Sequence, residues 1–165
     1  MSDSPSQPQV SAWFWELLKS SDRNLSALCR KLEELPRERL HQYRLQFDEA
    51  KDCVNPCHCE EYWPYMTDGG CSEDHGDDFA AWIVMQGQAP FDDLRSDPSR
   101  IQNLLDTFGG VESHEQPELA WDNRIDRDEY RGYQRADYIV TPIYELRFGE
   151  DLHDACYDGR GWPRE

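Results

Sequence analysis

The sequence is short of positive charge. Its 165 residues include 17 Lys and Arg against 34 Asp and Glu, which gives a formal net charge of −17 at pH 7. Nucleic acids and anionic membrane surfaces are bound mainly through clustered cations. The composition therefore argues against both as partners, and it favours a basic protein partner or a metal cation. The same acidity would also keep a protein soluble without any partner.

Long apolar runs are missing as well. No segment has the length of apolar residues that spans a bilayer, and the first nine residues lack the basic start and apolar stretch of a signal peptide. We therefore expect a cytoplasmic protein, in which the six Cys would be mostly reduced. The glycine pairs at 69–70 and 109–110 are not placed as phosphate-binding loops, and no Ser lies in a nucleophile elbow.

Aromatic residues, by contrast, are plentiful. Six Trp, eight Tyr and six Phe can fill a core although the hydrophobic fraction is only 38%. Residues 1–10 are rich in Ser, Pro and Gln and are expected to be a disordered lead-in. The remainder, residues 11–165, has the size of one domain, and we predict a single helical domain.

The most apolar helical pattern follows an acidic, glycine-containing loop. Apolar side chains over residues 79–86 recur at the spacing of one helix face, with Trp82 expected at the centre of the core. Asp77 or Asp78 is expected to cap the beginning of this helix, because a short side-chain oxygen can accept a hydrogen bond from an unpaired backbone N–H. Gly87 is expected to end it.

Amphipathic patterns elsewhere predict a mainly α fold, with helical hairpins packed around the 79–86 helix. Both a helix and a strand fit residues 138–148, and a helix capped by Thr141 is favoured. The Cys-rich loop at 52–66 and the C-terminal third are expected to be less regular. The further predicted helices cover residues 12–20, 24–35, 36–50, 89–95 and 98–108, the last one stopped by Gly109 and Gly110.

A cluster of Cys and His is the sharpest chemical feature. Zinc takes four nitrogen or sulfur ligands in a tetrahedron, often as two close pairs. The density of such residues predicts a metal site, although Cys-x-Cys is tighter than the usual pair, and the same residues would also fit as small buried side chains or loop residues. The predicted ligands are Cys57, Cys59, Cys71 and His75, with Cys53 and His58 as alternates.

Other chemistry has weaker support. Cys57 and His58 are neighbours in the chain and seldom face each other, so cysteine catalysis would need His75 or His114 as a base for Cys71. The acidic residues before the 79–86 helix lack the ligand order of a calcium loop, and carboxylates near a helix N-terminus explain them. The acidic and Arg residues that alternate over 122–131 are expected to form surface ion pairs.

The chain resembles the small bacterial family called domain of unknown function 4240, over about residues 12–108. The resemblance implies a fold but no established activity, and no catalytic residue is transferred from it. The chain departs from the family at residues 53–59, where the family usually has a smooth apolar helix, and its last third does not align readily. The matching residues are Phe14-Trp15-Glu16-Leu17-Leu18, Gly69-Gly70-Cys71-Ser72, Phe79, Trp82, Ile83, Gln86-Gly87, Phe91 and Asp97-Pro98.

Together these observations favour a non-enzymatic binding or regulatory module that acts on a protein partner. Immunity-type and antitoxin-like proteins are the analogy, because small acidic proteins of these classes neutralise basic partners. The alternative is a zinc-binding protein, structural or hydrolytic, built on the Cys and His cluster. The sequence defines neither the partner nor the oligomeric state.

Overall fold

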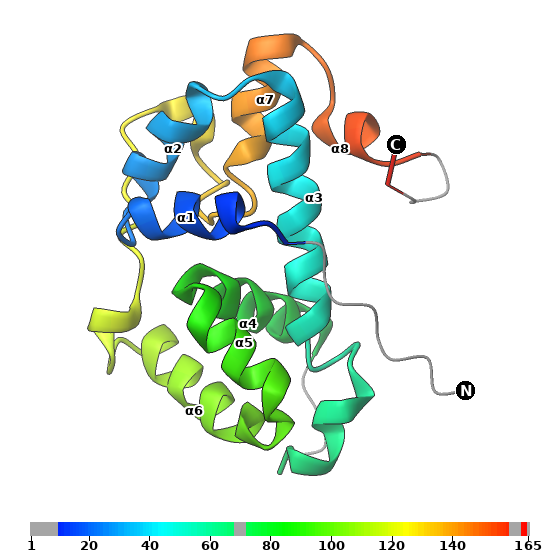
Figure 1. Ribbon diagram of the computed structural model, residues 1–165. Coiled ribbons are helices and arrows are strands. Elements are labelled where there is room, and N and C mark those ends of the chain that lie inside the picture. The colour runs from blue at the N-terminus through cyan, green and yellow to red at the C-terminus, as the bar shows by residue number, and fades with distance from the viewer. Residues whose placement is uncertain (1–9, 68–71, 159–162, 165) are drawn as a thin grey trace.

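A long helix, α3 (Arg37–Val54), organises the fold. The computed structural model describes residues 10–67, 72–158, 163 and 164. Figure 1 shows α3 running along the molecule, with one group of helices beside its first part and another beside its end. The first group is α1 (Ala12–Ser20), α2 (Leu25–Glu33), α7 (Val140–Phe148) and α8 (Leu152–Cys156), and the second is α4 (Glu73–Gln86), α5 (Gln88–Ser96) and α6 (Ile101–Glu112). The mainly α prediction is confirmed.

Short 3-10 helices fill several of the connections. They are η1 (Glu60–Tyr65), η2 (Pro98–Arg100), η3 (Pro117–Leu119) and η4 (Asp128–Tyr130). Within residues 138–148 the structure has a helix and not a strand: α7 covers Val140–Phe148 and is followed by Gly149 with a φ of 66°. Thr141 does not cap this helix, because α7 begins one residue before it, at Val140. In the described part of the chain, no helix is both long and apolar enough to cross a membrane.

One hydrophobic cluster includes residues from both helix groups. Phe14 of α1 packs against Tyr43 and Phe47 of α3, with ring centroids 5.6 Å apart in each pair. Trp82 is 8% exposed, so its predicted burial is confirmed. Ile143 of α7 belongs to the same cluster, and therefore the last third packs on the same core as the first hundred residues.

Helix α4 begins earlier than the sequence suggests. Its N-cap is Ser72, whose hydroxyl accepts a hydrogen bond from the His75 backbone N–H at 3.2 Å. The prediction that Asp77 or Asp78 caps this helix is therefore wrong. Both carboxylates lie within the helix, where they meet cations from distant segments. Gly87, with a φ of 110°, ends the helix as predicted.

Helix α6 continues past the two glycines that were expected to stop it. It runs to Glu112, because a helical glycine costs only about 1 kcal/mol relative to alanine and packing can offset that cost. The chain turns instead at His114, a non-glycine residue with a φ of 64°. The Gly110 carbonyl then accepts hydrogen bonds from the backbone N–H groups of Glu115 and Gln116, at 2.8 and 3.1 Å.

Candidate functional site

The Cys-rich segment forms a compact turn between α3 and η1. Asn55, 4% exposed, follows the last residue of α3, and its side-chain oxygen accepts a hydrogen bond from the Cys57 backbone N–H at 2.9 Å. Its carbonyl oxygen accepts two more, from the backbone N–H groups of His58 and Cys59, each at 3.1 Å. The turn is therefore shaped by hydrogen bonds to one buried asparagine.

This turn packs against the start of α4 at Gly76. A Cβ at position 76 would lie 2.6 Å from Asn55 Oδ1 and 2.7 Å from Cys57 Sγ, so only glycine permits this approach. The Cys57 thiol donates a hydrogen bond to the Ser72 carbonyl oxygen at 3.2 Å. The His75 ring packs on Phe108, with centroids 5.5 Å apart. The structure thus brings Cys57 to the first turns of α4, the part of the helix that contains His75.

The predicted zinc ligands are only partly visible. Cys71 lies outside the described residues. Among the predicted ligands that are described, including the alternates, no three place their ligand atoms within 4.8 Å of one another. The four-ligand zinc site therefore stays a prediction.

A different group does meet that distance within the described ranges. Asp151, His153 and Asp154 place three ligand atoms within 4.8 Å of one another, and all three residues are exposed. Asp151 already caps α8, since its carboxylate accepts a hydrogen bond from the Asp154 backbone N–H at 2.9 Å. This group is explained by helix capping on an acidic surface.

The environment of Cys59 does not favour nucleophilic chemistry. Burial raises the pKa of Cys59 to about 12, and the nearby Glu61 carboxylate adds to the effect. Burial also raises the pKa of Cys53. Because the thiolate is the nucleophile and the metal ligand, these thiols stay protonated and unreactive at neutral pH unless a cation is bound.

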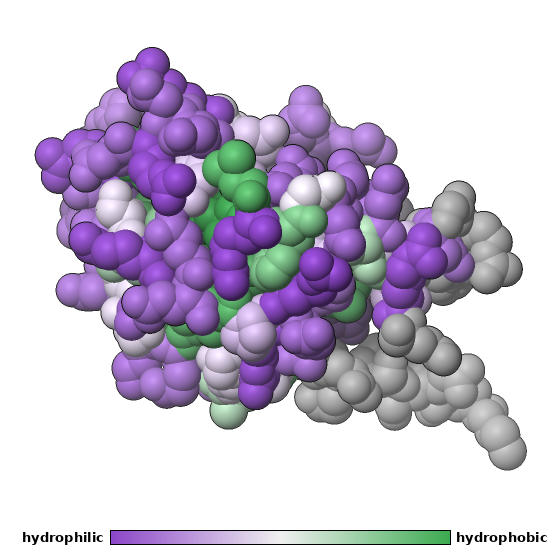
Figure 2. All heavy atoms as spheres, turned by 90° about the horizontal axis from the view of Figure 1, so that it is seen from above, coloured by the Kyte–Doolittle hydropathy of each residue, from purple (hydrophilic) through white to green (hydrophobic). Residues whose placement is uncertain are grey.

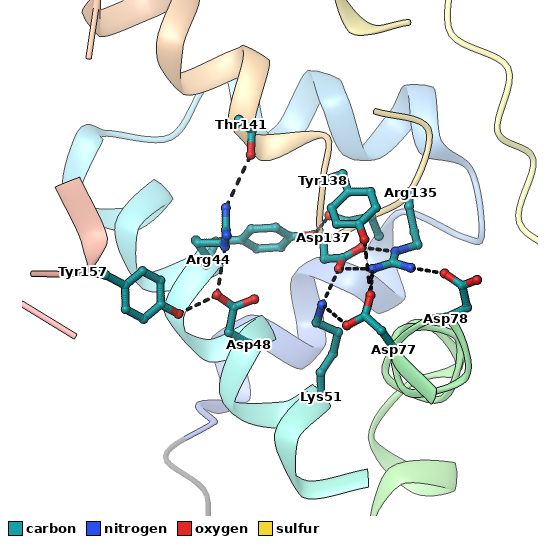
Figure 3. Close-up of polar contacts among 12 residues, drawn as sticks. Arg44, Asp48, Lys51, Asp77, Asp78, Arg135, Asp137, Tyr138, Thr141 and Tyr157 are labelled. Atoms are coloured by element: carbon teal, nitrogen blue, oxygen red, sulfur yellow. Dashed lines mark hydrogen bonds and ion pairs between the residues drawn. The ribbon is translucent and has the colours of Figure 1, made fainter. Parts of the chain in front are cut away.

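Charged side chains from three segments meet between α3, α4 and the chain before α7 (Figure 3). We call Lys51, Asp77, Asp78, Arg135 and Asp137 the charge cluster. Lys51 Nζ lies 2.9 Å from Asp77 Oδ1 and 2.8 Å from Asp137 Oδ2. The Arg135 guanidinium contacts all three carboxylates, each at 2.6 Å.

The charged side chains of the cluster form their hydrogen bonds and ion pairs with one another. Asp137 is only 2% exposed, yet both of its oxygens accept hydrogen bonds from cations. Burial raises the pKa of Asp77, but hydrogen bonds from Arg135 and Lys51 outweigh burial, so the pKa lies below its usual value. The Tyr138 ring covers the Arg135 guanidinium at 3.9 Å. These groups join segments of the chain, and the cluster has the character of a structural link.

A cleft of about 690 Å³ lies at the other end of α4 from that link, where the α1–α2 turn meets the α4–α5 junction and the chain near Trp121. This volume is in the range of about 300–1,000 Å³ that is typical of ligand sites. Trp15 is buried and Trp121 half-buried, so aromatic surface forms part of the lining. Five exposed charged residues also line the cleft: Glu16, Lys19, Asp22, Arg23 and Asp92.

The α1–α2 turn that borders the cleft has an unusual backbone. Asp22 and Arg23 have φ values of 49° and 53°, in the left-handed region that non-glycine residues seldom occupy. Each such residue costs on the order of 1 kcal/mol, and such strain is often found at functional sites. Hydrogen bonds keep the turn in place: Arg23 Nη1 donates to the Glu118 carbonyl at 2.6 Å, and the Asp122 N–H donates to the Arg23 carbonyl at 2.8 Å.

Hydrogen bonds also fix the segment around Trp121. Trp121 Nε1 donates to the Met85 carbonyl oxygen at 3.1 Å, and Gln86 Nε2 donates to the Leu119 carbonyl oxygen at 3.1 Å. The segment around Trp121 is thus tied both to the end of α4 and to the α1–α2 turn. Hydrogen bonds therefore hold these walls of the cleft in position.

A hydrophobic area lies at the end of the molecule where α7 finishes. Figure 2 looks onto this end and shows a limited hydrophobic area bordered by hydrophilic residues. Leu146 is 57% exposed there. The guanidinium groups of Arg37 and Arg147 lie 4.7 and 4.8 Å from the centroid of the Phe148 ring. Cations therefore cover part of this surface.

Comparison with known proteins shows the relationship of the chain as a whole. The family model described as "Protein of unknown function (DUF4240)" matches residues 11–145, which extends beyond the 12–108 region of the motif resemblance and into α7. No curated protein and no solved structure matches the chain. Because the family model covers most of the sequence, the chain belongs to the DUF4240 family of proteins of unknown function.

Proposed function

We propose that this protein is a non-enzymatic binding module that recognises a basic segment of a protein partner. The observation that carries the proposal is how the fold uses its cations. The chain has twice as many acidic as basic residues, and many of its cations form ion pairs with its own carboxylates. These cations are Arg37, Arg44, Lys51, Arg100, Arg124, Arg127, Arg131 and Arg135.

Carboxylates are therefore left in excess on the surface, and some of them border the cleft. Within the described residues, Glu16, Asp22 and Asp92 are exposed, and none of the three takes part in an ion pair. A preformed cleft of this kind can bind a cationic partner without reorganising, which lowers the cost of association. The acidic field around it would also speed encounter with a basic protein.

The biological role that we propose is neutralisation of a basic protein, as an immunity protein or an antitoxin does. This role rests on analogy with other small acidic proteins. The self-satisfied charge cluster and the protonated thiols support a binding function over a catalytic one, because neither presents an activated nucleophile or base.

The proposal is tested with the intact chain immobilised and exposed to a lysate of its own host at low salt. Proteins released by raising the salt concentration are identified, purified and titrated against this protein by calorimetry at several salt concentrations. We expect a basic partner whose affinity falls steeply with salt. A monodisperse preparation that retains no basic protein at low salt would overturn the proposal.

A second candidate, zinc binding, is favoured by one observation. The contact of Cys57 with Gly76 and with the Ser72 carbonyl places one predicted ligand beside the first turns of α4. Elemental analysis of the purified protein tests it, with the Cys57→Ser variant as the control. Stoichiometric zinc that is lost in the variant would support the site, whereas protein without zinc, iron or copper would exclude it.

A further inference from the structure

We propose that the cleft lined by Trp15 and Trp121 receives the guanidinium group of an arginine side chain from the basic partner. This inference rests on the proposed function and names the group that the site recognises. A guanidinium is planar, stacks on indole rings and donates hydrogen bonds to carboxylates in a fixed geometry. The cleft offers both kinds of partner.

One of the two indole rings can offer its face: Trp121 is half-buried, whereas Trp15 is only 6% exposed. The Trp15 ring packs against Phe14 and Phe91, with centroids 5.2 and 5.0 Å apart, so its position is fixed by the core. The Trp121 N–H is already bound to the Met85 carbonyl oxygen. Trp121 therefore has no donor left for a ligand, and what remains is its π surface, which attracts cations.

The carboxylates come from three different elements. Glu16 lies on α1, Asp22 on the strained turn and Asp92 on α5, and all three line the cleft. The strain at Asp22 is maintained by the hydrogen bonds of the neighbouring Arg23, so the fold spends stability to keep this turn in one conformation. A cation in the cleft would have carboxylates on several sides.

The two cations that line the cleft, Lys19 and Arg23, provide a way to test the charge of the ligand. The Arg23 guanidinium donates to the Glu118 carbonyl oxygen and is thereby committed to the wall. Lys19 is exposed at the last turn of α1, and no ion pair of the described residues includes it. Its ammonium would repel an incoming arginine and attract an anion. The effect of removing this charge therefore distinguishes a cationic ligand from an anionic one.

The first experiment uses a small probe, Nα-acetyl-arginine methylamide, titrated into the intact protein at low salt. Binding is followed by NMR at the indole N–H signals of Trp15 and Trp121, and the citrulline analogue, which has the same shape without the charge, is titrated in parallel. We expect saturable shifts with the arginine probe and at least about tenfold weaker binding of the citrulline probe. Equal binding of the two probes would overturn the proposal.

Charge variants supply the second readout. The cleft variant Glu16→Gln/Asp22→Asn/Asp92→Asn should weaken the arginine probe about tenfold, since Asn tolerates the left-handed turn and the variant should keep the fold. The control variant Glu60→Gln/Glu61→Gln/Asp74→Asn makes the same change in net charge on η1 and at the start of α4, and its affinity should stay near that of the unmodified protein. Circular dichroism and thermal unfolding verify folding.

The Lys19→Gln variant shows whether the cleft prefers a cationic or an anionic ligand. It should bind the arginine probe more tightly, and weaker binding would show that the cleft prefers anions and would overturn the inference. The last arm uses the basic partner itself. If the partner binds the unmodified protein and the cleft variant equally, the cleft assignment fails while the proposed function stands. If no basic protein binds at all, both fail.

Discussion

Gly76 of α4 and Cys57 of the Cys-rich turn lie so close together that position 76 has no room for a Cβ atom. A Cβ at position 76 would lie 2.7 Å from the Cys57 sulfur and 2.6 Å from the side-chain oxygen of Asn55. Asn55 is itself buried and forms the turn. The contact therefore sets the position of the whole Cys-rich turn on α4.

The Gly76→Ala variant should lower the free energy of unfolding by about 1–2 kcal/mol. Alanine favours a helix by about 1 kcal/mol, but overpacking against Cys57 and Asn55 costs more than this gain. Chemical denaturation measures the change. Gly109→Ala is the matched control, because no described atom lies within 4 Å of a Cβ there, and it should stabilise by up to about 1 kcal/mol. If both variants stabilised the protein equally, the close contact of Gly76 with Cys57 and Asn55 would be wrong.

The Asp137→Ala variant should be far more damaging. Asp137 is 2% exposed and partners both Lys51 and Arg135, so its removal leaves two half-buried cations short of a partner and should cost about 3 kcal/mol. Asp128→Ala serves as the control, because its pair with Arg131 is exposed on both sides and should contribute less than about 1 kcal/mol. Equal losses in the two variants would show that the charge cluster is not a structural link.

Acid stability should depend on Asp77. Hydrogen bonds from Arg135 and Lys51 outweigh the effect of burial and lower the pKa of Asp77 in the folded protein. The resulting stabilisation is complete above the ordinary carboxyl pKa of about 4, and it is lost as the pH falls through the lower folded value. The Asp77→Asn variant should therefore unfold at a lower temperature than the unmodified protein near neutral pH, and the difference should shrink towards pH 2.

Thermal unfolding followed by circular dichroism across this pH range measures the difference. The exposed Asp126, replaced by Asn, is the control and should keep the pH dependence of the unmodified protein. A difference between Asp77→Asn and the unmodified protein that stays constant with pH would contradict the assigned role of the carboxylate.

Buried thiols should resist modification in the native state. Burial raises the pKa of Cys29 to about 12 and that of Cys156 to about 11, so very little thiolate is present at neutral pH. Alkylation by iodoacetamide, followed residue by residue with mass spectrometry, should be much slower at these two positions in the native protein than in denaturant. Equal rates in the two states would show that the burial of these thiols is wrong.

The sequence predicts elements whose signals are local. The helical spacing over residues 79–86, the helix end at Gly87 and the preference for helix over strand within residues 138–148 all depend on neighbours in the chain. These predictions are confirmed, although α7 begins at Val140 and is not capped by Thr141. The start of α4 was misplaced for a non-local reason. Asp77 resembles a cap in its local setting, but its partner Arg135 lies 58 residues away. The signal for the true cap was present in Ser72, which is followed directly by two acidic residues.

The charge cluster and the cleft could not be derived from the sequence. The cleft joins Trp15, the turn at Asp22, the end of α4 and Trp121, which are brought together only by tertiary hydrogen bonds such as that of Arg23 to Glu118. The only local sign was the polar run after α1 that breaks the helical pattern. The zinc site stays a prediction, since Cys71, one of its four ligands, lies outside the described residues.

The charge cluster also has a consequence for the order of events during synthesis. Lys51 and Asp77 leave the ribosome long before Arg135 and Asp137, so the first half of the chain must wait for the counter-charges that complete its interior. Until then, the Lys51–Asp77 ion pair between α3 and α4 is the part of the charge cluster that can form. Stable closure of the molecule is therefore expected to be a late, nearly post-translational step. Ribosome-bound chains halted before Arg135 and Asp137 have emerged from the ribosome should be digested by proteases far faster than chains in which both residues have emerged.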